Sequence, residues 1–127
     1  MRVAIDASVL VALLNPHDVW HTQAIALTDT LITAGFTPMY FDCAIAEAIS
    51  AVARRLHEKG RGAEVPDMLA RLENQASHNL ITWIFPDVPR LYPHALDLIR
   101  ASSGELNFND ALIALACRER NIPAIKE

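Results

Sequence analysis

Three acidic residues stand where short apolar segments of the sequence give way to helical patterns. Asp6 follows the apolar segment Val3–Ile5, Glu47 lies soon after Phe41, and Asp110 is at the start of a long Ala- and Leu-rich pattern. Two carboxylates about 5 Å apart repel by roughly 3 kcal/mol at an effective dielectric near 20, and a divalent cation reverses that sign. Oxygen donors without His or Cys favour magnesium or manganese over zinc. Such an ion activates water and stabilises charge on a phosphodiester.

Each acid also has a purely structural explanation. Asp6 could cap the helix that follows it, and a carboxylate in the first turn complements the helix dipole, which covers Asp110 and in part Glu47. Glu47 also shares a polar helical face with Ser50 and Arg54. The residues taken singly leave both explanations open, although a charge at the end of a buried strand is costly and makes Asp6 the strongest candidate.

Strand-like and helical patterns alternate along the chain, which predicts a parallel sheet covered on both faces. The expected fold is a three-layer α/β/α domain spanning residues 1–127, with four or five short strands. We expect strands at Val3–Ile5, Thr37–Phe41, Leu80–Phe85 and Ile122–Ile125, and helices at Ser8–Leu14, Asp18–Ala34, Asp42–Lys59, Val65–Ala76, Leu91–Ala101 and Asn107–Arg120. Asp18 and Asp42 are expected N-caps, and Gly35 is an expected residue just beyond a helix C-terminus.

These elements bring the three acids to one place. Ligands of open parallel sheets bind at the carboxyl ends of the strands. Asp6 ends a strand there, Glu47 lies early in a helix that leaves that edge, and Asp110 lies early in a helix that must start there to reach the last strand. The sequence therefore predicts that the three carboxylates converge.

The balance of charge argues against long-range attraction to nucleic acid, because the net charge is −4. The basic cluster Arg54, Arg55, Lys59 and Arg61, with His57, is an exception. It is expected to contact RNA phosphates or an acidic partner, and the structural alternative is a solvated helix end whose cations favour the dipole.

Other features exclude several classes of protein. No apolar run reaches the roughly 20 residues of a membrane span, so we expect a cytoplasmic protein without a membrane segment. Cys43 and Cys117 lack metal-site spacing and are expected to be buried free thiols. Trp20 and Trp83 are interpreted as core or partner-contact residues rather than base-stacking platforms.

Three segments together resemble the PIN domain family, in particular the VapC-like toxins of prokaryotic toxin–antitoxin pairs. The segment VAIDASVLVALLN is similar to the family's first strand, acid, hydroxyl residue and helix. FDCAIAEAISAVARR resembles the segment that carries the second acid, and LNFNDALIALACRERNIPAI resembles that of the third acid, long helix and last strand. The resemblance covers nearly the whole chain.

The resemblance implies a Mg²⁺- or Mn²⁺-dependent endoribonuclease with Asp6, Glu47 and Asp110 as metal ligands and catalytic residues. Ser8 matches the family's hydroxyl position and is expected to orient a ligand or water, although it could instead bond a free N–H at the helix start. Implied partners are the RNA substrate, a VapB-like antitoxin and a second copy of the chain in a homodimer.

The chain departs from the family at one position. Many members carry a fourth acid about 18 residues beyond the third, which would be position 128, whereas the sequence ends at Glu127. The sequence given could be truncated, the fourth ligand could be absent, or Glu127 could replace it.

Other functions remain as alternatives. They are an RNA-processing PIN nuclease that is not a toxin, and a catalytically weak PIN domain that binds RNA or a partner. A haloacid-dehalogenase-like hydrolase is disfavoured, because it requires a second acid where Ser8 stands. A receiver domain is disfavoured because neither an acidic pair at the first strand nor a lysine on a late strand is evident.

Overall fold

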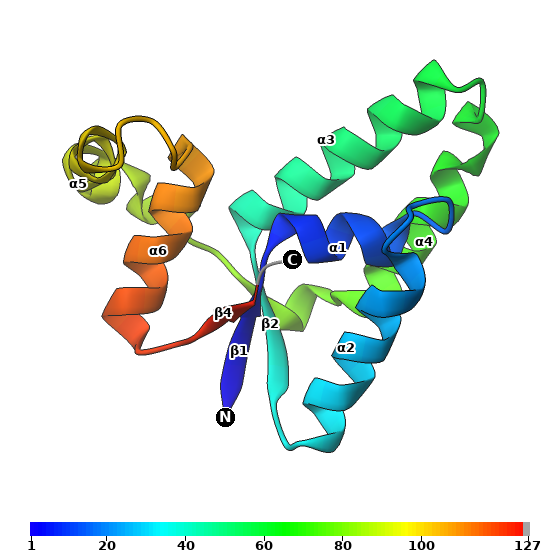
Figure 1. The fold of residues 1–127 in the computed structure, drawn as a ribbon, viewed down its shortest axis with the longest axis horizontal. Coiled ribbons are helices and arrows are strands. Elements are labelled where there is room, and N and C mark those ends of the chain that lie inside the picture. Colours follow the sequence, from blue (N-terminus) through cyan, green and yellow to red (C-terminus); the bar gives the residue numbers. More distant parts are fainter. Residues whose placement is uncertain (126–127) are drawn as a thin grey trace.

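The computed structural model describes residues 1–125 of the chain. Its centre is a four-stranded parallel sheet with the strand order β3-β2-β1-β4 (Figure 1). The strands are β1 (Arg2–Ile5), β2 (Thr37–Phe41), β3 (Ile81–Thr82) and β4 (Ala124–Ile125). The helices are α1 (Ala7–Leu14), α2 (His21–Thr33), α3 (Asp42–Glu58), α4 (Val65–Gln75), α5 (Val88–Ala101) and α6 (Phe108–Arg120), and three short 3₁₀ turns are η1 (Gly62–Glu64), η2 (His78–Leu80) and η3 (Phe85–Asp87).

Two hydrophobic clusters lie on opposite faces of the sheet. Val3 and Ile5 of β1 face the cluster formed with α1 to α4, whereas Ala4 between them faces the cluster formed with α5 and α6. This alternation follows from the period of two in a strand. Figure 1 shows the same division, with α5 and α6 on one side of the sheet and α1 to α4 on the other. The predicted three-layer α/β/α architecture is therefore confirmed.

The start of α2 differs from the prediction, because the helix begins at His21 rather than at Asp18. Pro16 follows the end of α1, and the Asp18 side chain accepts a hydrogen bond from the Trp20 N–H at 2.8 Å, which forms a local turn instead of a helix cap. The other end agrees with the prediction. Gly35 lies just beyond the helix with a φ of +91°, a conformation that glycine adopts without steric cost.

Two other expectations need correction. The predicted strand Leu80–Phe85 is reduced to Ile81–Thr82, because 3₁₀ turns occupy both of its ends. Asp42 is the first residue of α3 rather than its N-cap, which is Phe41. The remaining predicted helices and strands agree with the structure to within about three residues at each end.

The structure also tests the predictions made for the cysteines, the tryptophans and a membrane span. Both cysteines are free and buried, as predicted. Trp20 and Trp83 are 52% and 51% exposed, so a core role for either tryptophan is wrong. Over residues 1–125, none of the helices combines the length and apolar character needed to cross a bilayer.

Candidate functional site

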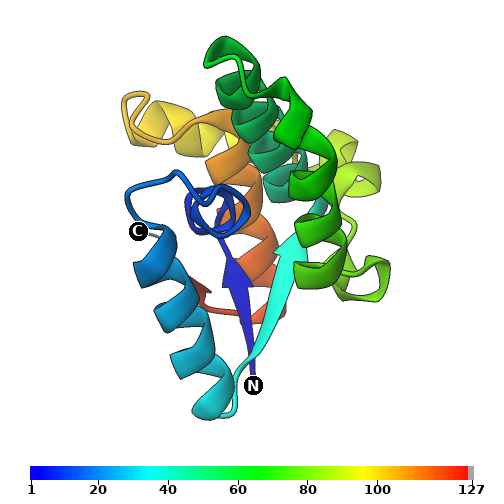
Figure 2. The same cartoon turned by 90° about the vertical axis from the view of Figure 1, so that its right-hand side faces the viewer.

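The first turns of three helices meet at the carboxyl end of the sheet. α1 follows β1 directly and α3 follows β2 directly, while α6 runs back along the sheet before the chain enters β4. Figures 1 and 2, which view the molecule from two directions, both show these helix starts beyond the tips of β1 and β2. Asp6, Glu47 and Asp110 lie at this edge, and each is partly buried.

Asp6 occupies the N-cap position of α1, but its side chain makes no capping hydrogen bond. Its Oδ2 atom instead accepts a hydrogen bond of 3.0 Å from the Ser8 hydroxyl. Asp6 therefore occupies the predicted cap position, but its carboxylate does not act as a side-chain cap. Ser8 bonds the carboxylate rather than a backbone N–H, which is the geometry expected of a residue that orients Asp6.

Glu47 lies in the second turn of α3 and faces α6. The Asn109 amide Nδ2 is 3.5 Å from Glu47 Oε2, at the outer limit of a hydrogen bond. Both residues line an open cavity of about 430 Å³, whose wall also includes Ser50 and Arg54. Glu47 therefore faces a solvent-accessible space between two helices rather than open surface.

Asp110 is the third residue of α6. Its backbone N–H donates to the side-chain oxygen of the N-cap residue Asn107 at 2.8 Å. Asn107 thus satisfies one of the free N–H groups of the first turn. Within residues 1–125 the Asp110 carboxylate accepts no hydrogen bond, although its position still complements the helix dipole.

The three carboxylates share an edge without forming a ready-made metal cluster. Among the described residues, no three His, Cys, Asp or Glu side chains are close enough to hold a metal ion as they stand. The chemistry of the donor set fits a hard divalent cation, because all three donors are carboxylates. Neither Asp6 nor Asp110 is engaged in an ion pair within residues 1–125, so both remain available as donors.

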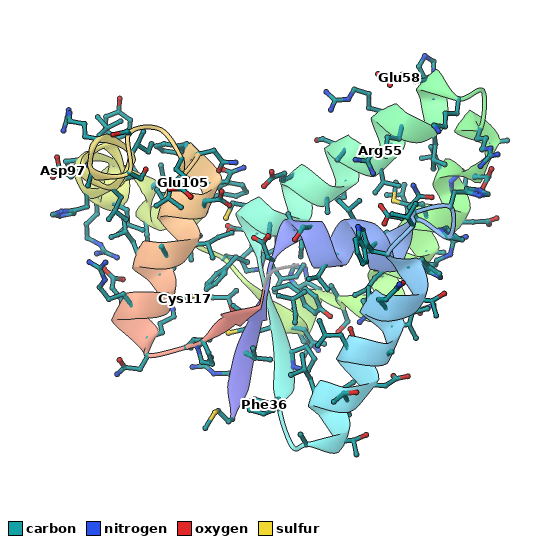
Figure 3. All side chains as sticks on the ribbon, viewed as in Figure 1. Phe36, Arg55, Glu58, Asp97, Glu105 and Cys117 are labelled. Carbon is teal, nitrogen blue, oxygen red and sulfur yellow. The ribbon has the colours of Figure 1, made fainter. Side chains whose placement is uncertain are left out.

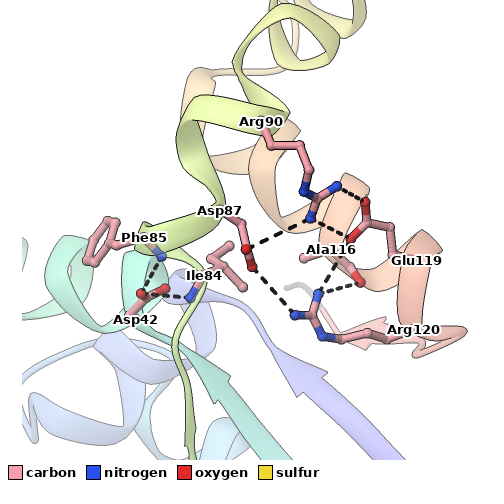
Figure 4. Close-up of polar contacts among 8 residues, drawn as sticks. All are labelled: Asp42, Ile84, Phe85, Asp87, Arg90, Ala116, Glu119 and Arg120. Atoms are coloured by element: carbon pink, nitrogen blue, oxygen red, sulfur yellow. Dashed lines mark hydrogen bonds and ion pairs between the residues drawn. The ribbon is translucent and has the colours of Figure 1, made fainter.

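A fourth acid at this edge has a different role. Asp42 directly follows β2, is only 3% exposed, and accepts hydrogen bonds from three backbone N–H groups. Ile84 N–H and Phe85 N–H donate to Oδ2 at 2.8 and 2.7 Å (Figure 4). Cys43 N–H donates to Oδ1 at 2.9 Å. Asp42 therefore anchors the segment between β3 and α5 to the start of α3.

The Cys43 thiol reports the electrostatics of this edge. Burial raises the pKa of Cys43 to about 12, and the negative charges of Asp42 and Glu47 add to that effect. The main cause of the shift is therefore burial, and the two carboxylates disfavour a further negative charge at Cys43.

The predicted basic cluster is divided between two surfaces. Arg54 lines the Glu47 cavity, and it also pairs weakly with Glu58 at 3.9 Å. Arg55, Lys59 and Arg61 line a different cleft against the loop that joins α1 and α2. In Figure 3, Arg55 and Glu58 mark the C-terminal half of α3, far from the end of the helix that meets the sheet.

Sequence reasoning missed Asn109. Its adjacency to Asp110 in the first turn of a helix could have indicated a role, because that turn was already expected to meet the other acids. Glu127, the candidate replacement for a fourth acid, lies outside the described residues.

Comparisons with known proteins identify a family and two similar structures. The family model described as "PIN domain" matches residues 3–127. The structure is similar to that of VapC20 from Mycobacterium tuberculosis, described as a Sarcin-Ricin loop cleaving toxin, with a TM-score of 0.67 and 21% identity over 94% of this chain and 84% of that chain.

It is also similar to VapBC2 from Rickettsia felis, described as bound to a DNA fragment from its promoter. That match has a TM-score of 0.69 and 13% identity, covering 99% of this chain and 86% of the other. At these identities the likeness concerns the fold. A search of curated proteins found no match.

Proposed function

Because this chain belongs to the PIN domain family, we propose that it is a metal-dependent endoribonuclease whose active site consists of Asp6, Glu47 and Asp110. One observation carries the proposal. The N-terminal ends of α1, α3 and α6 meet at the carboxyl end of the sheet, and Asn109 in the first turn of α6 lies 3.5 Å from Glu47 in the second turn of α3.

The side chains around the acids support this assignment. Ser8 donates to Asp6 at 3.0 Å and limits the rotation of that carboxylate. The Asn109 amide lies farther from Glu47, at 3.5 Å. Arg54 lies in the same cavity as Glu47, where its cation is placed to contact an RNA phosphate.

When bound, Mg²⁺ or Mn²⁺ supplies an activated water and stabilises charge on the phosphodiester that is cleaved. Asp6, Glu47 and Asp110 are the residues that would hold it. Their repulsion is lowest when a cation lies between them, so the protein is expected to bind the ion more tightly than any isolated carboxylate.

We further propose that the nuclease is the toxin of a toxin–antitoxin pair in the cytoplasm. The description of VapC20 as a cleaving toxin and the presence of VapBC2 among the similar structures support this role. A VapB-like antitoxin and a second copy of the chain are the proposed partners. Exposed apolar side chains such as Ile25 and Ile32 provide surface for such contacts.

The test is cleavage of labelled single-stranded RNA in Mn²⁺ or Mg²⁺, with and without EDTA. The informative variant is Asp110→Asn, because Asp110 has the simplest structural alternative. If Asp110 holds the ion, we expect the variant to lose at least about 100-fold in rate. If it only complements the helix dipole, the variant loses little activity and a few tenths of a kcal/mol of stability.

Asp29→Asn is the matched control, because Asp29 is an exposed carboxylate on α2 and lies outside the proposed site. Cleavage that persists in EDTA would contradict the metal-dependent mechanism. RNA binding without cleavage in either metal would favour the alternative of a catalytically weak domain. Cleavage without growth inhibition in cells would favour a processing nuclease over a toxin.

A further inference from the structure

A second polar cleft lies away from the carboxylates, between the C-terminal end of α3 and the loop that joins α1 to α2. It has a volume of about 420 Å³. Its lining residues come from two stretches of the chain and are Asn15, His17, Asp18, Val19, Trp20, Arg55, Leu56, Lys59 and Arg61. None of these residues belongs to the proposed active site. We call this feature the α3-end cleft.

The α3-end cleft is positively charged on a molecule whose net charge is −4. Three cations line it, Arg55, Lys59 and Arg61, against the single carboxylate of Asp18. Asp18 pairs with Arg55 at 3.4 Å, whereas Lys59 and Arg61 form no ion pair within residues 1–125. Two cations therefore remain available to an anionic ligand.

The loop wall of the cleft is held in place by hydrogen bonds. Asn15 is buried, and its Oδ1 accepts from the His17 N–H at 3.1 Å. Asp18, whose side chain is only 13% exposed, accepts from the Trp20 N–H through Oδ1 and pairs with Arg55 through Oδ2. One carboxylate thus fixes the backbone at Trp20 relative to a cation of α3. A ligand would meet a largely preformed surface, which lowers the entropic cost of binding.

Trp20 adds an aromatic surface to the same cleft. It is 52% exposed, so part of its ring is open to solvent rather than buried in the core. Cations beside an exposed aromatic ring are the combination that binds single-stranded nucleic acid, in which the phosphates meet the cations and a base stacks on the ring. An acidic peptide would pair with the same cations, but a nucleic-acid base offers the indole a flat stacking partner that an acidic side chain does not.

We propose that the α3-end cleft binds a flanking segment of the single-stranded RNA substrate, with phosphates on Lys59 and Arg61 and a base on Trp20. This inference rests on the proposed ribonuclease function. Glu47 lies in α3, and Lys59 directly follows the end of that helix, twelve residues later. Twelve helical residues correspond to ~18 Å along the helix axis. Arg54 lies between them in sequence, so RNA bound at both sites would follow α3. The cleft would then favour long substrates over short ones.

The protein contains two tryptophans, which allows a direct optical test. In an Asp6→Asn, Trp83→Leu protein, which is designed not to degrade the RNA, Trp20 is the sole tryptophan. We expect RNA of about 12 nucleotides, within the usual range of 4–16 per binding fold, to quench its fluorescence. Trp20→Leu should weaken binding about fivefold or more, and Trp20→Phe should retain most of the affinity because it keeps an aromatic ring.

The phosphate contacts are tested through salt dependence. Lys59→Gln with Arg61→Gln should lower the slope of log K against log salt by about 1.4, which is 0.7 for each phosphate contact in a single strand. Arg100→Gln with Arg118→Gln is the matched control, because it removes the same charge from α5 and α6, away from the cleft. The control should leave the slope unchanged.

An equal change in slope for both double variants would overturn the proposal, since long-range charge would then explain the binding. Quenching of Trp20 by poly-glutamate but not by RNA would also overturn it and assign the cleft to an acidic protein partner. These binding measurements require no catalysis, so the two proposals fail separately. If the cleft binds RNA but the wild-type protein cleaves none in either metal, only the proposed nuclease function is contradicted. An active nuclease with no RNA on Trp20 would contradict only the inference about the cleft.

Discussion

Asp6 and Asp42 are two aspartates in equivalent places with opposite environments. Each directly follows a central parallel strand, β1 or β2, and each stands where a helix begins. Asp42 is 3% exposed, and its carboxylate accepts hydrogen bonds from three backbone N–H groups. Asp6 is partly buried, and in the described residues its carboxylate accepts only the Ser8 hydroxyl.

The difference arises from what lies opposite each strand end. β3 pairs with β2, so the chain leaving β3 passes over Asp42 and presents the N–H groups of Ile84 and Phe85. Within residues 1–125, the Asp6 carboxylate accepts a hydrogen bond from the Ser8 hydroxyl alone, so it keeps unused acceptor capacity. A charge is stable in either setting, but only a carboxylate with unused acceptor capacity can take part in binding.

The largest expected effect is the loss of RNA cleavage when Asp6, and not Asp42, is changed. Asp6→Asn should lower RNA cleavage by at least about 100-fold, because an amide is a far weaker ligand for a hard cation. The fold should be unaffected, since the Asn carbonyl can still accept from Ser8. Rates and melting temperatures of the variant and the wild type provide the measurement. A variant that cleaves normally would remove Asp6 from the active site and abolish the contrast.

The second effect concerns stability and falls on the other aspartate. Asp42→Ala leaves the Ile84 and Phe85 N–H groups without their acceptor, which should cost about 3 kcal/mol, at roughly 1–3 kcal/mol for each unsatisfied group. For a chain of this size that corresponds to a decrease in Tm of about 10 °C. Denaturant unfolding measures the loss. Below the transition, the folded protein should cleave RNA at nearly the wild-type rate, and a selective loss of activity would place Asp42 in the site.

Much of the scaffold follows from sequence patterns because they are local. Strand ends, helix starts and the Gly35 terminus depend on neighbouring residues, and the rule that ligands meet the carboxyl ends of parallel strands then places Asp6, Glu47 and Asp110 at one edge. The same rule treats Asp42 as equivalent to Asp6. Local pattern gave no means to distinguish them, because the partners of Asp42 lie 42 and 43 residues away.

The α3-end cleft is a second feature that local sequence patterns did not predict. Arg55, Lys59 and Arg61 formed a visible cluster in the sequence, but Trp20 was interpreted as a core or partner-contact residue. In the structure Trp20 is 52% exposed and lines the cleft beside these cations. Local sequence patterns do not show this, because the cations lie on a distant part of the chain.

A third, smaller effect tests how Asp6 is held. Ser8→Ala removes the one hydrogen bond that the Asp6 carboxylate accepts within residues 1–125 but leaves the carboxylate itself. Residues that orient a metal ligand typically contribute 10- to 100-fold in metal affinity or activity, so we expect a loss near the lower limit, about tenfold, that higher Mn²⁺ concentration partly restores. Titration of cleavage rate against Mn²⁺ distinguishes this from a helix-start role, which would lower Tm and leave the metal dependence unchanged.

The smallest effect tests whether Asp42 alone secures the segment before α5. An ion-pair network begins nearby at Asp87 and continues through Arg90 to Glu119 and Arg120 (Figure 4). The hydrogen bond from Arg90 lowers the pKa of Glu119 below its ordinary value of 4.5. The charged form of Glu119 therefore favours the folded state above the unfolded pKa, and this contribution is lost as the pH falls through the lower folded pKa.

Glu119→Gln should decrease Tm at pH 7 by much less than Asp42→Ala, because the pair is exposed. The difference in Tm from wild type should vanish in acid. A larger decrease, or one that grows on acidification, would mean that the network and not Asp42 holds this segment to the sheet.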